Sequence, residues 1–374
     1  MKTVFVGMSG GVDSSVTAGI LRDQNYSVVG VHLRCFNVDG CAKQDAEDAR
    51  HAAETLGIPL YMFDFEKEYR EKVVEYMIDG YCRGITPNPD VVCNREIKFG
   101  LFLKKALEMG AYYVATGHYI RLRRIRLNPR IHHSDPPAGG EESAFALFAA
   151  RDRDKDQSYF LWTLTQKQLA HCLFPLGNLI KKTDVRRLAR KYKLPNAKKK
   201  DSQGICFLGA VHLPEFLGRY IPARQGAIVN TAGEKLGEHR GAHFYTIGQR
   251  HGLGVGGSAT PLYVAEKNIR ANIVTIAEEG SDSLYRHEIT LSHANFISPL
   301  FAYSNELTNN KKGVKVYVRV RYRQPLFPAR LIIRNSLFVI QFEIRQRSVA
   351  EGQSAVFYAK NGEMLGGGII EKTR

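Results

Sequence analysis

The stretch Ser9-Gly10-Gly11-Val12-Asp13-Ser14-Ser15 decides the fold of this chain. Before it, residues Thr3 to Met8 are mostly β-branched or apolar, which predicts a strand buried on both faces of a parallel sheet. After it, Val16, Ile20 and Leu21 recur at helical spacing, so the glycines lie in a strand-to-helix turn. Such a turn aims backbone N–H groups and the positive end of a helix dipole at one point, and it therefore predicts an anion site.

The residue types in this turn narrow the kind of anion site. Gly10 and Gly11 let the backbone approach a phosphate, and Ser9, Ser14 and Ser15 offer hydroxyl donors. An ordinary P-loop ends in a lysine, but this turn has none and carries an aspartate instead. Ser-Gly-Gly-x-Asp-Ser resembles the signature of the PP-loop ATP pyrophosphatases, which cleave ATP to AMP and pyrophosphate and usually adenylate an oxygen of their substrate. A generic glycine-rich turn is the alternative, and the full motif after an N-terminal strand argues against it.

Length and composition are those of an ordinary globular protein. A chain of 374 residues is too long for one small core and predicts two or three domains. The hydrophobic content of 44% and the charged content of 24% exclude disorder of the whole chain. No apolar run is as long as a membrane span, and the start MKTVFVG has no signal-peptide pattern, so we expect a cytoplasmic protein with no membrane partner.

The charge of the chain predicts a polyanionic partner. A formal net charge of +16 attracts polyanions, of which nucleic acid is the commonest in a cytoplasm. A helix predicted over Thr183 to Leu194 carries an all-positive outer face, which favours contacts with RNA phosphates over a merely solvated face. Solubility alone is the alternative explanation of the surplus charge.

The six cysteines do not form a disulfide framework, because the chain is large and its expected compartment is reducing. No two of them are spaced as C-x-x-C, which argues against zinc-ribbon and iron–sulfur sites. We therefore predict no metal ligands in the protein. Their positions are Cys35, Cys41, Cys82, Cys93, Cys172 and Cys206.

Strands alternate with helices in the first part of the chain. Strands are predicted over Tyr26–Leu33, Ile58–Phe63 and Tyr112–His118, and a helix over Asp45–Leu56. This alternation predicts an α/β domain with a doubly wound parallel sheet, whose ligands bind at the carboxyl ends of the strands. Leu33 and Gly117 fall at two of these ends, beside the glycine-rich turn.

The segment from Thr86 to Phe99 contains the first candidate nucleophile. Two prolines fix an extended entry and Asn94 could cap the following helix, which places Cys93 near a helix N-terminus. The helix dipole and a neighbouring Arg95 or Lys98 favour the thiolate, the reactive form of cysteine. A small buried hydrophobe is the equally open alternative.

Four motifs in order carry a family resemblance. They are Asn88-Pro89-Asp90-Val91-Val92-Cys93-Asn94, Gly117-His118-Tyr119, Lys155-Asp156-Gln157-Ser158-Tyr159-Phe160-Leu161 and Gly204-Ile205-Cys206-Phe207. Together they resemble the bacterial tRNA-specific 2-thiouridylases, PP-loop enzymes that place sulfur on C2 of the wobble uridine of certain tRNAs. The resemblance runs from residue 3 to the C-terminal segment.

The resemblance implies a nucleotide site and a first chemical step. ATP, expected to come with Mg²⁺, adenylates O2 of the uracil so that AMP becomes the leaving group. The residues implied for the phosphates are Gly7, Met8, Ser9, Gly10, Gly11, Val12, Asp13 and Ser14, and those implied for the adenosine are Leu33 and Gly117.

The resemblance also implies roles for two cysteines. Cys206 carries a persulfide that delivers sulfur, and Cys93 is the nucleophile that closes a transient Cys93–Cys206 disulfide. Asp90 acts as a general acid/base. Asn88, Pro89 and Asp90 line the pocket of the flipped-out target base, which costs little to extrude from a single-stranded anticodon.

Two further stretches are implied to contact tRNA. They are Lys155-Asp156-Gln157 and Arg321-Tyr322, whose alternatives from the residues alone are a solvated helix start and a solvated sheet face. The implied substrates are tRNAs of the lysine, glutamate and glutamine type. The implied sulfur donor is a sulfur-relay protein or a cysteine desulfurase.

The rest of the chain divides into smaller parts. The stretch from Arg121 to Glu142 is arginine-rich, then rich in proline and glycine, which predicts a flexible excursion. Beyond Cys206 the glycines multiply, and Tyr245–Gly254 could be a second phosphate loop or a structural turn. From Val314 onward apolar and polar residues alternate, which predicts a small β-barrel whose basic face includes Arg319 and Arg330.

We therefore predict a PP-loop domain of the adenine nucleotide alpha hydrolase type over residues 1–207, a small central α+β domain over 208–278 and a C-terminal β-barrel over 279–374. The predicted function is ATP-dependent thiolation of tRNA. The alternatives are another PP-loop ligase or amidotransferase-like enzyme that uses no cysteine, and a non-catalytic RNA-binding protein with a vestigial PP-loop.

Overall fold

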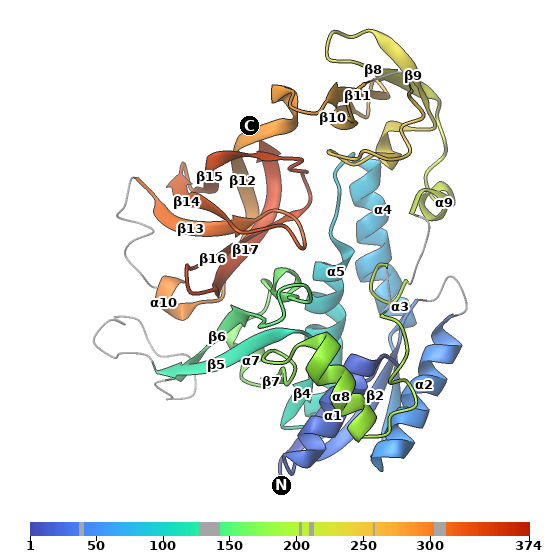
Figure 1. Cartoon of the computed structure of the whole chain (residues 1–374), viewed down its shortest axis with the longest axis vertical. Coiled ribbons are helices and arrows are strands. Elements are labelled where there is room, and N and C mark those ends of the chain that lie inside the picture. The colour runs from blue at the N-terminus through green and yellow to red at the C-terminus, as the bar shows by residue number, and fades with distance from the viewer. Residues whose placement is uncertain (37–40, 127–142, 202–203, 209–212, 257–258, 303–311) are drawn as a thin grey trace.

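A computed structural model describes residues 1–36, 41–126, 143–201, 204–208, 213–256, 259–302 and 312–374 (Figure 1). The N-terminal sheet lies at the bottom of the view in Figure 1, a small glycine-rich domain at the top and a β-barrel to one side between them. Among the described residues, no helix is both long and apolar enough to cross a membrane.

The N-terminal domain is built on the predicted parallel sheet. Its strands are β1 (Thr3–Gly7), β2 (Ser27–Arg34), β3 (Leu60–Asp64), β4 (Tyr113–Ala115) and β7 (Cys172–Leu173). They pair in parallel in the order β3-β2-β1-β4-β7. The order reverses between β1 and β4, and ligands of such sheets bind outside the carboxyl ends of the strands at this switch point.

Helical segments cover both faces of the sheet. On one face, α1 (Val12–Asp23), α2 (Cys41–Leu56), the π-helical turn η4 (Lys181–Val185) and α8 (Arg186–Lys191) share one apolar core. Two continuous segments belong to the other core, α3-η1-α4 (Glu66–Tyr69, Arg70–Val74, Glu75–Cys82) and α5-η2-α6 (Pro89–Val92, Cys93–Phe102, Leu103–Glu108). The short helices η3 (Ser158–Phe160) and α7 (Gln166–Leu169) complete the domain.

The small domain follows α9 (Leu213–Gly218). Its strands are β8 (Gly226–Val229), β9 (Lys235–His239), β10 (Leu262–Asn268) and β11 (Ile273–Glu278), ordered β10-β11-β8-β9. The helical turns η5 (Ala242–Phe244) and η6 (Asp282–Leu284) flank β10 and β11 in the chain. The domain stands at the end of α4, which contacts η5 (Figure 1).

The C-terminal part is a closed barrel, as predicted. Its strands are β12 (Tyr285–Phe296), β13 (Val314–Arg319), β14 (Phe327–Arg334), β15 (Leu337–Arg347), β16 (Ser354–Tyr358) and β17 (Glu363–Thr373), with α10 (Pro299–Ala302) after β12. Pairing between β12 and β17 closes it. The alternation of β13 buries Val316 and Val318, but Arg319 is also buried. The prediction that Arg319 belongs to an exposed basic face was therefore wrong.

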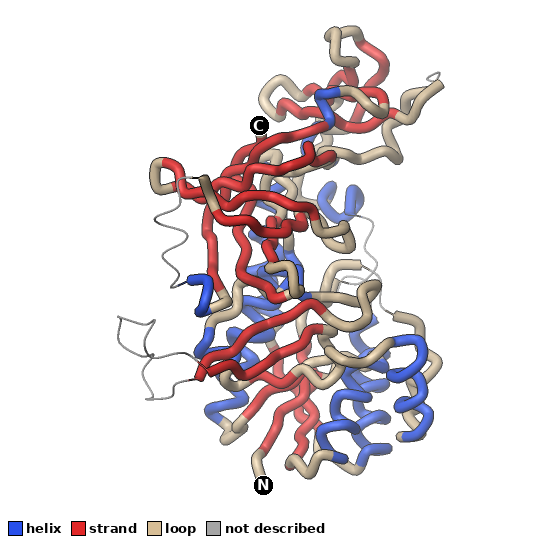
Figure 2. Tube along the Cα trace, turned by 60° about the vertical axis from the view of Figure 1, so that its left-hand side comes forward, coloured by secondary structure: helices blue, strands red, loops and turns tan. Residues whose placement is uncertain are grey.

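The predicted excursion after Ile120 begins as ordered structure. Strands β5 (Ile120–Arg126) and β6 (Ser143–Ala149) form an antiparallel hairpin, and β6 pairs with β17 of the barrel (Figure 2). The prediction of a flexible segment was wrong for residues 121–126, because the barrel edge offers their hairpin a partner. Residues 127–142 lie outside the described residues.

The barrel and the N-terminal domain share buried polar contacts. Asp156, which precedes η3, accepts a hydrogen bond of 3.2 Å from a guanidinium N–H of Arg319, and both side chains are buried. The Tyr159 hydroxyl donates to the Ser354 carbonyl oxygen at 2.9 Å, and Trp162 Nε1 donates to Ser354 Oγ at 3.0 Å. The barrel is thus held to the segment that leads into α7.

Candidate active site

The glycine-rich turn has a backbone that only glycine fits. Gly10 has a φ of +73°, and a Cβ there would lie 2.3 Å from the carbonyl oxygen of Asp45. Gly11 caps α1, and the hydroxyls of Ser14 and Ser15 both donate to its carbonyl oxygen, at 3.1 and 3.0 Å. The turn is therefore rigid, and it places the N-terminus of α1 at the switch point of the sheet.

The predicted nucleotide residues meet at this edge of the sheet. Gly117 follows β4 and lies so close to α1 that a Cβ there would be 2.8 Å from the backbone nitrogen of Ser14. Leu33 is buried near the carboxyl end of β2, two residues after Val31, whose carbonyl oxygen accepts a hydrogen bond from the backbone N–H of Met8 at 2.7 Å. The structure thus brings together Gly7–Ser14, Leu33 and Gly117, and nucleotide binding by them stays a prediction.

Asp13, the unusual carboxylate of the turn, has two strong donors. Its Oδ1 accepts hydrogen bonds from the Tyr119 hydroxyl at 2.7 Å and from Lys181 Nζ at 2.6 Å. Lys181 lies at the start of η4 and also pairs with Asp201 Oδ1 at 2.9 Å. The sequence motifs did not single out Lys181, because it lies 168 residues from Asp13 in a region without a motif.

Asp201 forms ion pairs with three cationic side chains. It pairs with Lys181, with Lys155 and, at 3.4 Å, with Arg186. Burial acts to raise the pKa of Asp201, but hydrogen bonds from Lys155 and Lys181 outweigh it and lower the pKa to about 2. This carboxylate is therefore ionised throughout the neutral range.

The second centre lies on the segment α5-η2. Asn88 caps α5 by accepting the Val91 N–H at 3.3 Å, with Pro89 at the first helical position. Asn94 was predicted as the cap, but it lies inside the helical segment, where its Nδ2 donates to the Asp90 carbonyl oxygen at 2.9 Å. Because the helical segment begins at Pro89, Cys93 does not lie at the positive N-terminal end of that segment.

Cys206 is held against this segment. Its backbone N–H donates to Asp90 Oδ1 at 2.9 Å, and the Tyr69 hydroxyl donates to its carbonyl oxygen at 2.5 Å. Cys93 is fully buried, and its thiol lies close enough to Cys206 for each thiol to shift the pKa of the other. Both cysteines are free thiols in this structure, side by side.

The two thiols differ in pKa. The hydrogen bond from Cys93 and the charge of Lys98 overcome burial and lower the pKa of Cys206 to about 7. Burial, together with the neighbouring Cys206 sulfur, holds the pKa of Cys93 well above its usual value. The predicted position of Cys93 near a helix N-terminus favoured a thiolate at Cys93. The pKa shifts favour the thiolate at Cys206 instead, with Lys98 as its counter-ion.

Asp90 and Lys98 connect the thiols with their surroundings. Burial raises the pKa of Asp90, although its hydrogen bond from Cys206 opposes the shift. Burial acts to lower the pKa of Lys98, but the charges of Cys206 and Cys93 raise it, so Lys98 stays cationic. Burial and the charge of Lys98 hold the pKa of His118, the neighbour of Gly117, well below its usual value. Lys98 thus affects the pKa values of both thiols and of His118.

The residues implied to contact tRNA lie in two places. Asn88 lines a cavity of 160 Å³ with Arg95 and with barrel residues that include His293 and Ser354. Arg321 donates to the Ile247 carbonyl oxygen at 2.5 Å, and Tyr322 packs on Phe160 with ring centroids 4.5 Å apart.

The triplet 155–157 is largely engaged within the protein. Lys155 is half-buried in its pair with Asp201, and the carboxylate of Asp156 is buried against Arg319. Gln157 Oε1 accepts the Tyr119 N–H at 3.1 Å. Direct contact of these residues with RNA stays a prediction.

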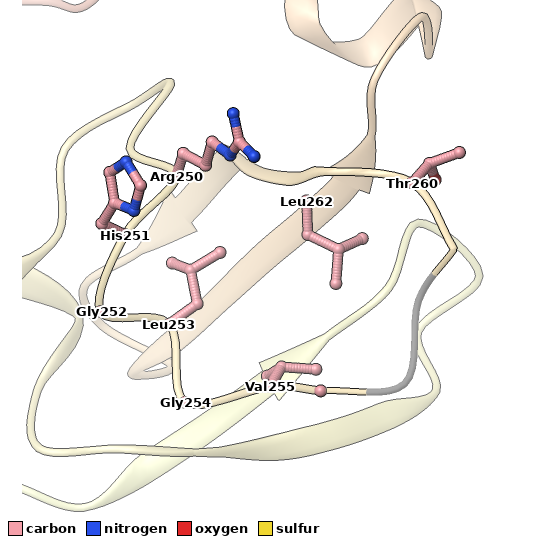
Figure 3. Close-up of a pocket in the computed structure, with 9 residues that line it drawn as sticks. Arg250, His251, Gly252, Leu253, Gly254, Val255, Thr260 and Leu262 are labelled. Carbon is pink, nitrogen blue, oxygen red and sulfur yellow. The ribbon is translucent and has the colours of Figure 1, made fainter.

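The glycine-rich loop of the small domain lines an open hollow of its own (Figure 3). Arg250, His251 and Leu253 lie on one side of it, and Thr260 and Leu262 on the other. Its volume is about 510 Å³, and none of the residues predicted for ATP or for catalysis lines it. The alternative of a second phosphate loop at this place stays open.

Family models cover most of the chain in three parts. The model described as "tRNA methyl transferase HUP domain" matches residues 2–210. The "tRNA methyl transferase PRC-barrel domain" matches residues 214–278, and the "Aminomethyltransferase beta-barrel domain" matches residues 286–370.

Curated relatives match over nearly the whole length. The chain is 42% identical to the tRNA-specific 2-thiouridylase MnmA of Staphylococcus saprophyticus, covering 98% of this chain and 95% of that protein. It is 38% identical to the tRNA-specific 2-thiouridylase MnmA of Christiangramia forsetii, covering 99% of this chain and 100% of that protein. Among solved structures, the NMN synthetase of Francisella tularensis aligns at 19% identity and a TM-score of 0.33, over 55% of this chain and 69% of that one.

Proposed function

The chain belongs to the family of tRNA-specific 2-thiouridylases, and from this premise we propose that it replaces the C2 oxygen of the wobble uridine of tRNA by sulfur at the expense of ATP. The observation that carries the proposal is the pair of neighbouring thiols, one buried and one with its pKa lowered to about 7, in a domain with a glycine-rich turn at a helix N-terminus. Transfer of sulfur through a cysteine persulfide needs a reactive thiolate and a second thiol that releases the sulfur.

The first step is activation of the base. ATP binds with its phosphates at Gly7–Ser14 and its adenosine against Leu33 and Gly117, and the uracil O2 attacks the α-phosphorus. Pyrophosphate leaves and O2 becomes the oxygen of an AMP leaving group. Mg²⁺ would come with ATP and would be held by phosphate oxygens and water, because the described residues contain no cluster of three or more metal-ligating side chains.

The second step transfers sulfur. Cys206, loaded as a persulfide by a sulfur-relay protein or a cysteine desulfurase, attacks C2 with its terminal sulfur, and AMP departs with the electron pair of the C2–O bond. Cys93 then attacks the inner sulfur of Cys206, which forms the Cys93–Cys206 disulfide and releases 2-thiouridine. The proximity of the two thiols, each of which shifts the pKa of the other, supports this step.

Asp90 serves as the acid/base group of this step. Its carboxylate already accepts the N–H of Cys206, and its raised pKa suits it to take the proton that Cys93 must lose. Asn88, Pro89 and Asp90 receive the flipped base.

tRNA is recognised mainly by charge. The net charge of +16 and the basic residues of α8 supply phosphate contacts, with Lys155–Gln157 and Arg321–Tyr322 near the site. The substrates are tRNAs for lysine, glutamate and glutamine.

Two of the matching families are described as tRNA methyl transferase domains, which names a different reaction. Transfer of a methyl group uses no persulfide and no second cysteine. Dependence on both cysteines therefore separates the two reactions.

The proposal is tested with unmodified glutamate tRNA, ATP, Mg²⁺ and a persulfide donor. Mass spectrometry of the digested nucleosides is expected to find one sulfur in place of oxygen on the wobble uridine. Cys206→Ala and Cys93→Ala are each expected to abolish the product. A methylated nucleoside, or sulfur transfer that survives both substitutions, would contradict the proposal.

A further inference from the structure

The glycine-rich turn combines groups that attract a phosphate with one that repels it. Its backbone N–H groups suit phosphates, yet Asp13 adds a carboxylate that would repel the triphosphate of ATP. The turn also lacks the lysine with which an ordinary P-loop neutralises the outer phosphates. A cation must therefore come from elsewhere in the chain.

The structure supplies one at Lys181. Its side chain is 4% exposed, and its ammonium group lies between Asp13 at 2.6 Å and Asp201 at 2.9 Å. Its backbone is fixed as well, because the Lys181 N–H donates to Asp152 Oδ2 at 2.8 Å. A buried ammonium group in a fixed position costs desolvation, which the two carboxylates offset.

The hydrogen-bonding capacity of Lys181 is not used up. An ammonium group has three N–H donors, and the described residues give Nζ of Lys181 two acceptors. The cations Lys181, Lys155 and Arg186 lie among the carboxylates of Asp13 and Asp201, and Asp152 accepts the backbone N–H of Lys181. The ammonium group therefore has one N–H donor that the described residues leave available to a ligand.

We propose that Lys181 is the phosphate-binding lysine of this site, which donates its third N–H to the β- or γ-phosphate of ATP and stabilises pyrophosphate as it leaves. Asp13 and Asp201 hold the ammonium group in place before the nucleotide arrives, so that it needs no reorganisation during the reaction. This inference deepens the proposed function and depends on its ATP site.

The test compares two nucleotides that differ only in the outer phosphates. Binding of MgATP and of AMP is measured by isothermal titration calorimetry on the full chain, for the wild type and for Lys181→Gln. We expect the affinity for MgATP to fall at least about tenfold and the affinity for AMP to change less than about twofold, because AMP has no β- or γ-phosphate. An equal loss for both nucleotides, or no loss for either, would overturn the assignment.

Two further variants keep the test decisive. Lys181→Arg retains the charge and is expected to recover most of the preference for MgATP, which guards against a folding defect in the glutamine variant. Lys199→Gln is the matched control, because Lys199 also lies between two carboxylates, Asp45 and Asp48, but does not contact Asp13. It should leave the ratio of the two affinities unchanged, and a loss of preference there equal to that of Lys181→Gln would count against the proposal.

Failure of the inference and failure of the proposed function give different results. A wild-type protein that binds MgATP and thiolates tRNA, with Lys181→Gln unaltered in the MgATP-to-AMP ratio, would remove Lys181 alone. A wild-type protein that binds neither nucleotide would overturn the ATP site and Lys181 with it.

Discussion

Two neighbouring thiols differ in pKa: Cys93 and the charge of Lys98 lower the pKa of Cys206, whereas burial raises the pKa of Cys93. The sequence indicated a cation near Cys93, but only the folded chain shows that the ammonium group of Lys98 stabilises Cys206 instead. The persulfide-bearing cysteine of the proposed reaction is therefore also the nucleophilic one. Cys93 stays protonated until Cys206 has changed its chemical state.

The first prediction concerns the pH dependence of Cys206. Because its pKa is lowered to about 7, its alkylation by iodoacetamide should be half-maximal near that pH and fall below it as the thiolate is protonated. Lys98→Met removes the counter-ion, so the labelling curve should move to higher pH. Peptide mass spectrometry measures the labelling. Lys72→Met, which breaks the ion pair of Lys72 with Glu96 on the segment of Lys98, should not move the curve.

A second prediction concerns Asp90. Asp90→Asn keeps an oxygen that can accept the Cys206 N–H but removes the group that takes a proton. We expect the rate of thiolation to fall by about 10²-fold or more, while alkylation of Cys206 persists, since the carboxylate charge acts to raise the pKa of that thiol. Thiolation at the wild-type rate in single-turnover assays would exclude Asp90 as the acid/base.

At the scale of elements, the parallel sheet and the barrel strands could be predicted from the sequence, because their patterns are local. The apolar run of β1 and the alternation of β13 each depend on neighbouring residues. The partners of buried polar groups could not be predicted. Arg319 lies in an alternating strand and turns inward only because Asp156, 163 residues away, is there to pair with it.

The same limit applies to the candidate site. The motifs predicted the glycine-rich turn and both cysteines, because each is a compact pattern of residues. They did not predict the ion pair between Lys181 and Asp13, or that the helical segment containing Cys93 begins at Pro89. Both depend on how separate elements meet, which no short pattern encodes.

A third prediction tests the shape of the turn before α1. Gly10→Ala should abolish ATP binding, because its Cβ would lie 2.3 Å from the backbone of α2 and its φ is positive. Gly110→Ala is the control, since Gly110 also has a positive φ but its Cβ would meet no atom within 4 Å. The control should lose only about 1 kcal/mol of stability in thermal unfolding and keep its affinity for ATP.

At the scale of the whole molecule, the barrel is joined to the catalytic domain through buried polar groups as well as through strand pairing. Asp156, Tyr159 and Trp162 reach the barrel from the segment that also contains Lys155. The positions of the two domains are thus fixed relative to each other.

A fourth prediction tests this joint. Arg319→Met leaves the buried carboxylate of Asp156 without its ion pair, so the free energy of unfolding should fall by about 3–5 kcal/mol. The double variant with Asp156→Asn should lose less than the single one, because no uncompensated charge remains. Chemical denaturation measures both. Arg83→Met, which breaks an exposed pair with Asp79, should change stability little.

The most direct test of the account is a single turnover with protein whose Cys206 has been loaded as a persulfide and freed of donor. After addition of ATP and unmodified tRNA, we predict one AMP and one 2-thiouridine per persulfide, together with a peptide in which Cys93 and Cys206 are joined by a disulfide. 2-Thiouridine formed while both cysteines end as free thiols, with no reductant present, would contradict the proposed sulfur transfer.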